Sequence, residues 1–313
     1  MTFRRELFKL EDGGQVGLDW LEPEPESAET PILVVIHGVN GGSRERYIQH
    51  YLVNVRKAFE CRCVVMVLRG LGGVPMTNPY SYTAGSTEDI RAVVIDIHKR
   101  YPNAPLIGAG FSMGANIMAK YVGEEGEKCL FRSVICVSCP FDLQAAADYM
   151  EKPGMMNRRY SENMARGHVR FVKKNIDAVS KCPNIDIDLI CSSRTNREYI
   201  DHAARMYFGL SGSKEYYKIY SSLPVIHNTA VPTLYINSND DPMIGSLVIE
   251  EARKELKDNA NTALVVSPCG GHLGFIEARG FNPSRWSKNG DSWIDRVAPQ
   301  FYKASLYPAE EAK

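Results

Sequence analysis

The sequence has no excess of charge of either sign, because 37 lysine and arginine residues are matched by 37 aspartate and glutamate residues. A nucleic-acid-binding protein normally carries a basic excess or a basic stripe, and electrostatic binding to a membrane surface needs a polybasic segment. We therefore expect no nucleic-acid partner. Hydrophobic residues make up 44% of the 313 residues and charged residues 24%, which excludes an intrinsically disordered chain.

Long apolar runs and a leader-type N-terminus are also missing. No stretch approaches the roughly 18 consecutive apolar residues of a membrane-spanning helix, and the opening MTFRRELFKLEDGG has charges where a signal peptide needs its apolar stretch. The eight cysteines lie mostly inside apolar runs such as SVICVSC. These features predict a cytoplasmic protein with reduced core thiols, and they leave peripheral membrane contact and the oligomeric state open.

Metal-binding and nucleotide-binding motifs are absent as well. The segments CRC (61–63) and CVSC (136–139) have no second Cys/His pair at zinc spacing, and neither HExxH nor a Walker A sequence occurs. The glycines of GAGFSMG (108–114) depart from the G-x-G-x-x-G fingerprint of dinucleotide-binding folds and come in mid-chain, after earlier predicted strands. We therefore expect no cofactor and no metal.

What is present is an alternation of apolar runs and amphipathic stretches. Apolar runs flanked by Gly and Pro are typical of strands buried on both faces, so the pattern predicts an α/β fold with a mostly parallel eight-stranded sheet flanked by helices. Strands are expected at residues 3–10, 15–21, 31–36, 63–68, 105–111, 131–138, 231–237 and 262–268. Helices are expected at residues 44–59, 86–100, 113–123, 245–257 and 291–306.

The alternation stops between residues 141 and 229, where helical stretches follow one another without a β-branched run. We predict a single domain over residues 1–313 with a helical cap inserted at 141–229. Large flexible or aromatic side chains in this segment could line an acyl-chain pocket or simply pack the cap against the sheet. They are Tyr149, Met150, Met155, Met156, Met164, Met206, Tyr207 and Phe208.

The segment GFSMG (110–114) is a G-x-S-x-G motif between a predicted strand and a predicted helix. In serine hydrolases of this type the nucleophile sits on a tight, strained turn that only small neighbours allow. The helix that follows aims N–H groups at the developing negative charge. The motif alone also fits an ordinary Gly-rich turn, so Ser112 is a candidate that needs partners.

Two further residues supply those partners. His272 lies in CGGHLG directly after the last predicted strand, and Asp240 and Asp241 follow the strand before it. The chain order Ser, Asp, His, each at the carboxyl end of a strand, is the order of α/β-hydrolases. Because these strand ends meet at one edge of the sheet, the sequence predicts a nucleophile, acid and base at Ser112, Asp241 and His272.

The choice between the two acids depends on the proline that follows. Pro242 restricts Asp241 to an extended conformation and so fixes the direction of its side chain. Asp240 has a ready structural role as acceptor of backbone N–H groups in the turn before the helix at 245–257. Asp241 is therefore favoured as the acid, with Asp240 and Asp142 as alternatives.

The segment HGVNGGS (37–43) follows an early predicted strand, where hydrolases place an oxyanion loop. The expected oxyanion donors are the backbone N–H groups of Val39 and Met113. We expect His37 to support this loop rather than to transfer a proton. Histidines 50, 98, 168, 202 and 227 are expected at the surface or in the cap.

Taken together, several segments resemble those of YheT-like hydrolases, a branch of the α/β-hydrolase superfamily with mammalian abhydrolase-domain lipases and plant embryogenesis-associated proteins. The segments are HGVNGGS, LRGLGG, TEDIRAVV, PLIGAGFSMGANIMAKYVGEEG, SCPFDLQAAA, YY (216–217) and INSNDDP, within residues 12–277. The resemblance implies a serine hydrolase of carboxylic esters, including acylglycerols and phospholipid acyl chains in some members, and Asp241 matches the acid position.

This chain departs from the family's common residues at Leu71, where relatives often have Cys, and at Met113, where they often have Leu. Many eukaryotic relatives carry an N-terminal membrane anchor, and we expect none in this chain. We therefore expect a serine esterase or lipase-type enzyme acting on small acyl esters or lipids, with short- to medium-chain acyl groups favoured. A peptidase or amidase on the same fold, and a non-catalytic binding protein that keeps the fold, are the rival interpretations.

Overall fold

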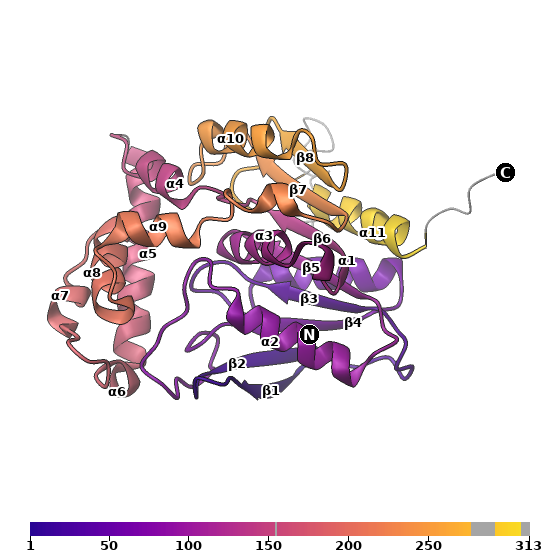
Figure 1. Ribbon diagram of the computed structural model, residues 1–313, viewed down its shortest axis with the longest axis horizontal. Helices are drawn as coiled ribbons and strands as arrows, with labels where there is room; N and C mark the ends of the chain where they lie inside the picture. The colour runs from indigo at the N-terminus through magenta and orange to yellow at the C-terminus, as the bar shows by residue number, and fades with distance from the viewer. Residues whose placement is uncertain (154, 277–291, 308–313) are drawn as a thin grey trace, which may run out of the picture.

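The strands of the chain form one sheet in the computed structural model, which describes residues 1–153, 155–276 and 292–307. The sheet has eight strands in the order β1-β2-β4-β3-β5-β6-β7-β8. The pairs β1–β2 and β2–β4 are antiparallel and the others are parallel. Helices cover both of its faces (Figure 1). The predicted mostly parallel α/β sheet is confirmed.

The strand boundaries follow the apolar runs of the sequence. The central strands are buried along their whole length, as expected of parallel strands covered on both faces. Val34 in the middle of the sheet pairs with Val64 on one side and Gly108 on the other. The strands are β1 (Phe3–Lys9), β2 (Gln15–Leu21), β3 (Ile32–Ile36), β4 (Arg62–Val67), β5 (Leu106–Phe111), β6 (Phe131–Val137), β7 (Thr233–Ser238) and β8 (Thr262–Ser267).

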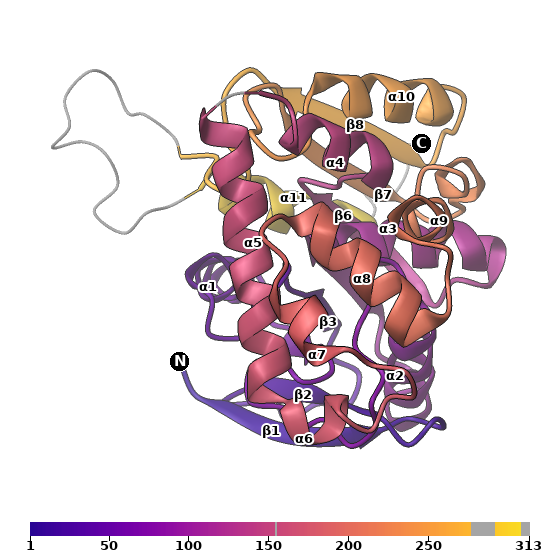
Figure 2. The same cartoon turned by 90° about the vertical axis from the view of Figure 1, so that its left-hand side faces the viewer.

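The helices that alternate with these strands cover the sheet with apolar stripes. In α1, for example, Ile48, Leu52 and Val55 recur at helical spacing and are all buried. Figures 1 and 2 show α1 and α11 on one face of the sheet and α2 and α3 on the other. These helices and the one beside β8 are α1 (Arg46–Ala58), α2 (Glu88–Arg100), α3 (Met113–Glu125), α10 (Ser246–Leu256) and α11 (Trp293–Leu306).

A second group of helices lies between β6 and β7 in the chain, and we call them the insertion helices. They stack on one another beside one end of the sheet (Figure 2), with α5 against α8 and α9 against both α8 and α4. They are α4 (Leu143–Met150), α5 (Met155–Lys174), α6 (Ile176–Val179), α7 (Ile187–Cys191), α8 (Asn196–Phe208) and α9 (Ser213–Tyr220). None of the helices in the described parts of the chain has the length and apolarity needed to span a bilayer.

Tyr302 ties α11 to α1 and to the middle of the sheet. Its hydroxyl donates to the Gly108 carbonyl of β5 at 2.7 Å, and the Tyr51 hydroxyl of α1 lies 2.7 Å away. Since Tyr302 has a single hydroxyl proton and donates it to Gly108, Tyr51 must be the donor to Tyr302. Both tyrosines are buried, so this short chain of hydrogen bonds runs through the core.

We expect the Tyr302→Phe variant to lower the free energy of unfolding by about 1–3 kcal/mol, because it leaves the buried Tyr51 hydroxyl without an acceptor. Urea denaturation at pH 7 measures the change. Tyr307→Phe is the matched control, because this tyrosine is 62% exposed and its hydroxyl should matter by less than about 0.5 kcal/mol. Equal stability of the two variants would contradict the role given to Tyr302.

Candidate active site

Ser112 occupies a strained turn between β5 and α3. Its backbone has φ 55° and ψ −120°, a conformation that is costly for a residue other than glycine. The glycines on either side make the turn possible, because a Cβ at Gly114 would lie 2.4 Å from the Ile36 carbonyl oxygen and one at Gly110 would lie 2.4 Å from the Gly114 oxygen. The turn therefore projects the serine side chain from the carboxyl end of β5.

A hydrogen-bonded chain of three side chains starts at this serine. His272 Nε2 lies 2.7 Å from Ser112 Oγ, and His272 Nδ1 lies 2.8 Å from Asp241 Oδ2. A carboxylate can only accept, so in the neutral ring Nδ1 carries the proton and Nε2 accepts from the serine hydroxyl. Asp241 is fully buried, while His272 keeps 17% of its side chain exposed. The structure thus brings the three sequence-predicted residues into contact.

Asp240 and Asp241 face in different directions and hold different segments. Asp241 Oδ1 accepts the backbone N–H groups of Met243 at 2.8 Å and Ile244 at 3.3 Å, which leaves Oδ2 for the histidine. Asp240 is exposed, and its Oδ1 accepts the N–H groups of Gly270 and Gly271, each at 2.8 Å. The expectation that Asp240 would cap the turn before α10 was wrong, because its partners belong to the loop that carries His272.

The loop that carries His272 is fixed on its other side by two serines. The Ser238 hydroxyl donates to the Gly271 carbonyl at 2.6 Å, and the Ser138 hydroxyl donates to the carbonyl of His272 itself. The slight desolvation of Asp240 acts to raise its pKa, but the hydrogen bonds from Gly271 and Gly270 outweigh it and hold the pKa below its ordinary value. The negative charge that anchors this loop is therefore retained well below neutral pH.

The segment 37–43 forms a loop beside Ser112, and His37 supports it. His37 Nδ1 lies 2.7 Å from the Gly38 carbonyl oxygen, and the Leu68 backbone N–H donates to Nε2 at 3.3 Å. Burial lowers the pKa of His37 to about 4, so the ring is neutral at pH 7. Both ring nitrogens are engaged with backbone, which agrees with the expected supporting role.

Two backbone N–H groups beside Ser112 are free to bind a ligand. Neither the Val39 nor the Met113 N–H has a hydrogen-bond partner in the described ranges. Both residues line the same cavity as Ser112. The loop comes close to the serine, because a Cβ at Gly38 would lie 3.3 Å from the Ser112 Cβ. The two sequence-predicted oxyanion donors are therefore at the site and unpaired.

Asp19 on β2 holds the far end of this loop, and sequence reasoning missed it. Its carboxylate accepts the Ser43 hydroxyl and lies 2.6 Å from Arg5 Nη2, and it is buried. The signal was available, because an acid inside the apolar strand VGLDWL must have a partner to be buried. Arg5 also donates to the Gly72 carbonyl, which joins β1 to the neighbouring loop.

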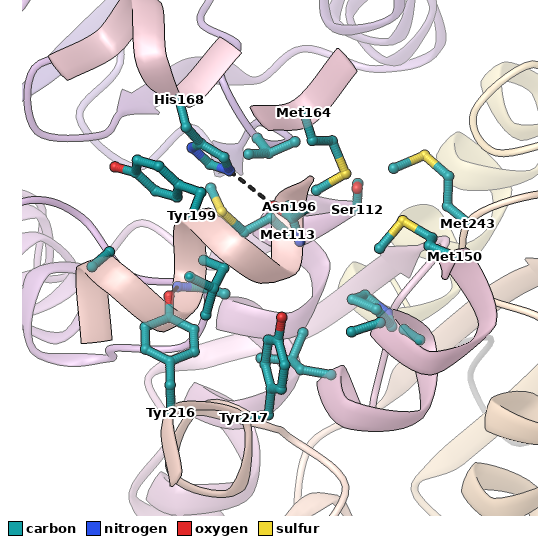
Figure 3. Close-up of a pocket in the computed structure, with 18 of the residues that line it drawn as sticks. Ser112, Met113, Met150, Met164, His168, Asn196, Tyr199, Tyr216, Tyr217 and Met243 are labelled. Carbon is teal, nitrogen blue, oxygen red and sulfur yellow. Dashed lines mark hydrogen bonds between the residues drawn. The ribbon is translucent and has the colours of Figure 1, made fainter. Parts of the chain in front are cut away.

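Ser112 and His272 open into a cavity between the sheet edge and the insertion helices. It contains about 880 Å³ of space free of protein atoms, part of it open to solvent. Figure 3 shows Ser112 with His168 and Asn196 on one side and Met150 and Met243 on the other. None of the described residues that line it is an Asp, Glu, Lys or Arg. The cavity is therefore suited to uncharged, largely apolar ligands.

The insertion side chains singled out from the sequence divide between this cavity and the packing around it. Those that line the cavity are Met150, Met164, Tyr207 and Phe208. Tyr149 packs on Gly245 instead, and Met206 accepts the Asp186 N–H through its sulfur at 3.4 Å. The side chains of residues 155 and 156 lie outside the described residues. Some of these side chains thus line the pocket, and others pack within the fold.

His168 was expected as an ordinary cap residue, but it is buried in the cavity wall. Its ring stacks on Tyr199 with centroids 4.3 Å apart, and Nε2 lies 3.2 Å from Asn196 Oδ1 (Figure 3). Nδ1 lies 3.4 Å from the Tyr82 hydroxyl, whose single proton is within reach of both Nδ1 and Asn40 Oδ1, the latter at 3.3 Å. This network connects α5 and α8 to the oxyanion loop, a connection that no local pattern could indicate.

Most of the chain matches a known protein family. The family described as "alpha/beta hydrolase fold" matches residues 31–279. The chain belongs to the α/β-hydrolase family. The expectation of a hydrolase-family enzyme is confirmed with it, and the site described above lies where the strands of an α/β-hydrolase end.

Individual relatives place this α/β-hydrolase in the YheT-like branch. Human phospholipase ABHD3 is 30% identical over 325 aligned residues, covering 99% of this chain and 74% of ABHD3. YheT of Escherichia coli is 30% identical over 279 residues, covering 89% of this chain and 80% of YheT. The solved esterase Pf2001 of Pyrococcus furiosus has a TM-score of 0.57 at 16% identity, over 96% of this chain and 92% of that one, and shows the fold. The branch expected from the motifs is confirmed.

The division of labour between the two aspartates predicts very different effects of the same substitution. We expect Asp241→Asn to lower kcat by about 10⁴, because an amide in this position holds the histidine in the wrong tautomer. Asp240→Asn keeps an oxygen that can accept the two glycine N–H groups, so its kcat should fall by less than about tenfold. Steady-state kinetics on a p-nitrophenyl ester compares them, and a larger loss at 240 would show that the acid is assigned to the wrong residue.

The two buried histidines predict how stability depends on pH. Burial lowers the pKa of His37 and of His168 to about 4 from the ordinary 6.5. The unfolded chain therefore binds more protons than the folded one. The contribution of these two histidines to the free energy of unfolding is fully present above pH 6.5 and is lost as the pH falls toward 4. Each histidine should account for about 2 kcal/mol between pH 7 and pH 5.

Urea denaturation at pH 7 and at pH 5 checks this for the His168→Gln variant. The difference in the free energy of unfolding between the two pH values should be smaller by about 2 kcal/mol than in the wild type. His227→Gln is the control, because that side chain is 49% exposed and the variant should keep the wild-type difference. A wild-type difference in His168→Gln would show that His168 is not neutral and buried in solution.

Proposed function

We propose that the chain is a serine hydrolase that cleaves carboxylic esters through a triad of Ser112, His272 and Asp241. The observation that carries the proposal is the continuous contact from Ser112 Oγ to His272 Nε2 and from His272 Nδ1 to Asp241 Oδ2, at 2.7 and 2.8 Å. The first distance is within the range that transfer of the serine proton to the histidine requires, and the second lets the carboxylate orient the ring. The insertion helices act as the cap, residues 141–229, of a single hydrolase domain spanning residues 1–313.

In the first half of the reaction Ser112 attacks the ester carbonyl while His272 accepts the serine proton at Nε2. The buried Asp241 carboxylate stabilises the resulting imidazolium and keeps Nδ1 protonated. The backbone N–H groups of Val39 and Met113 bind the oxyanion of the tetrahedral intermediate. His272 then donates its proton to the leaving alcohol, and an acyl-enzyme remains on Ser112.

In the second half a water molecule attacks the acyl-enzyme. His272 accepts a proton from this water, the same N–H groups bind the second oxyanion, and the proton returns to Ser112 Oγ as the acid departs. Each atom of the cycle is supplied by ester, water and these side chains, so the mechanism calls for no cofactor.

The cavity favours an ester with an apolar acyl group over a peptide. Its described lining has no charged side chain that could bind a peptide terminus, whereas its methionines adapt to alkyl chains of different shape. We propose small acyl esters with short- to medium-length chains as substrates, including acylglycerols and the acyl chains of phospholipids. The names of human phospholipase ABHD3 and of the yeast monoacylglycerol lipase, which is 33% identical to this chain, support this substrate class.

A fluorophosphonate probe tests the nucleophile directly, because it reacts covalently only with an activated serine. We expect the wild-type protein to be labelled and Ser112→Ala to be unlabelled, with a loss of esterase activity of about 10⁴-fold or more. Ser192→Ala, a serine at the surface end of α7, is the control and should label like the wild type. Labelling that persists in correctly folded Ser112→Ala would overturn the assignment.

A further inference from the structure

Two buried tyrosine hydroxyls in the cavity wall have no hydrogen-bond partner in the described parts of the chain. They belong to Tyr207 on α8 and Tyr217 on α9, which both line the cavity that contains Ser112. The two side chains are only 4% and 3% exposed, and their hydroxyl oxygens are buried without a partner among the described residues. A buried hydroxyl left unpaired destabilises the fold, so each of the two calls for an explanation.

Neighbouring tyrosines show that this state is not general in the cavity. The Tyr216 hydroxyl, next in sequence to Tyr217, accepts the Ala84 backbone N–H at 2.8 Å. The Tyr82 hydroxyl donates to Asn40 Oδ1 at 3.3 Å. The hydroxyls of these two cavity tyrosines are thus bonded within the protein, whereas those of Tyr207 and Tyr217 are not.

The position of Tyr217 indicates what its hydroxyl is for. Figure 3 shows the Tyr217 ring rising from α9 with its oxygen directed into the space enclosed by the side chains drawn, on the same side as Ser112 and Met150. The lining of the cavity is largely apolar and includes Leu143, Ala146 and Ala147 from the start of the insertion. In such surroundings a single hydroxyl is a strong discriminator of ligand polarity.

The absence of charged groups from the described lining narrows the ligand further. An anionic phosphate or carboxylate that entered the cavity would lose its hydration without meeting a cation there. An uncharged oxygen, such as a hydroxyl, an ether or a second carbonyl, would lose much less and could pair with a tyrosine hydroxyl.

We propose that Tyr207 and Tyr217 are specificity-determining residues, whose hydroxyls bind an uncharged oxygen of the substrate away from the scissile bond. The preferred substrate is then an ester that carries a second, uncharged oxygen function on its alcohol or acyl side, rather than a plain alkyl ester. This assignment rests on the esterase function proposed above and names the substrate class of the same cavity.

Three octanoate-based esters of similar size test the proposal. Propyl octanoate has no second oxygen function, 1-glyceryl octanoate adds two hydroxyls on the alcohol side, and propyl 8-hydroxyoctanoate adds one on the acyl side. We expect the wild-type enzyme to prefer at least one hydroxylated ester over propyl octanoate. In Tyr207→Phe or Tyr217→Phe, kcat/KM for that ester should fall about five- to tenfold, mainly through KM, as the loss of one neutral hydrogen bond predicts.

The plain ester and a neighbouring tyrosine provide the controls. Propyl octanoate should react equally well, within about twofold, in the wild type and in both variants. Tyr216→Phe should keep the wild-type ratio between hydroxylated and plain esters, because its hydroxyl is already bonded to Ala84. Its melting temperature should fall, whereas the melting temperatures of Tyr207→Phe and Tyr217→Phe should equal or exceed that of the wild type.

The results separate this assignment from the proposed function. A fall in the ratio of kcat/KM for a hydroxylated ester to kcat/KM for propyl octanoate, in either variant, supports the role of the tyrosine that was changed. The ester that responds identifies the side of the substrate that this tyrosine binds. A ratio unchanged in both variants, or an equal loss for all three esters, overturns the proposal. Turnover of propyl octanoate that survives in Ser112→Ala would instead overturn the esterase mechanism, whatever the tyrosine variants do.

Discussion

The close approach of the turn at Ser112 to the end of β3 is the constraint on which the rest of the site depends. Gly114 lies so near the carbonyl oxygens of Ile36 and His37 that a methyl group in its place would overlap them. This contact lets α3 begin directly beside the loop that follows β3. Val39 and Met113, the first residue of the helix, both line the cavity that contains Ser112, and neither backbone N–H has a partner among the described residues.

Each polar group around this turn has its own hydrogen-bond partners. Asp241 uses one oxygen for its own turn and the other for His272, while Asp240 anchors the loop that carries the histidine. His37 is held neutral by burial and serves the loop after β3. Because every one of these groups is hydrogen-bonded, the proposed triad is oriented before a ligand enters, and little reorganisation is needed during the reaction.

The insertion helices form part of a cavity in whose described wall most polar side chains have a hydrogen-bond partner. Most polar side chains in its wall, such as His168 and Tyr82, are bonded to one another and to the loop beside Ser112. A change in the position of α5 would therefore be felt at Asn40, next to the proposed oxyanion donor Val39. The hydroxyls of Tyr207 and Tyr217 stand outside this network, and for that reason they are the groups through which the cavity can distinguish one ester from another.

Local sequence determined the strands, most of the helices, the turn at Ser112 and the position of His272 after the last strand. Apolar runs, glycines and Pro242 act through near neighbours in the chain, so their effects can be recognised without the fold. Local sequence also favoured Asp241, but only the tertiary structure decided what Asp240 does, because its partners lie about 30 residues away. The burial of His168, the link from Asn40 to α5 and the unpaired tyrosines were likewise decided by packing between distant segments. Hydrogen bonds of that kind depend on which side chains meet in space, and no periodicity or spacing along the chain specifies such a meeting.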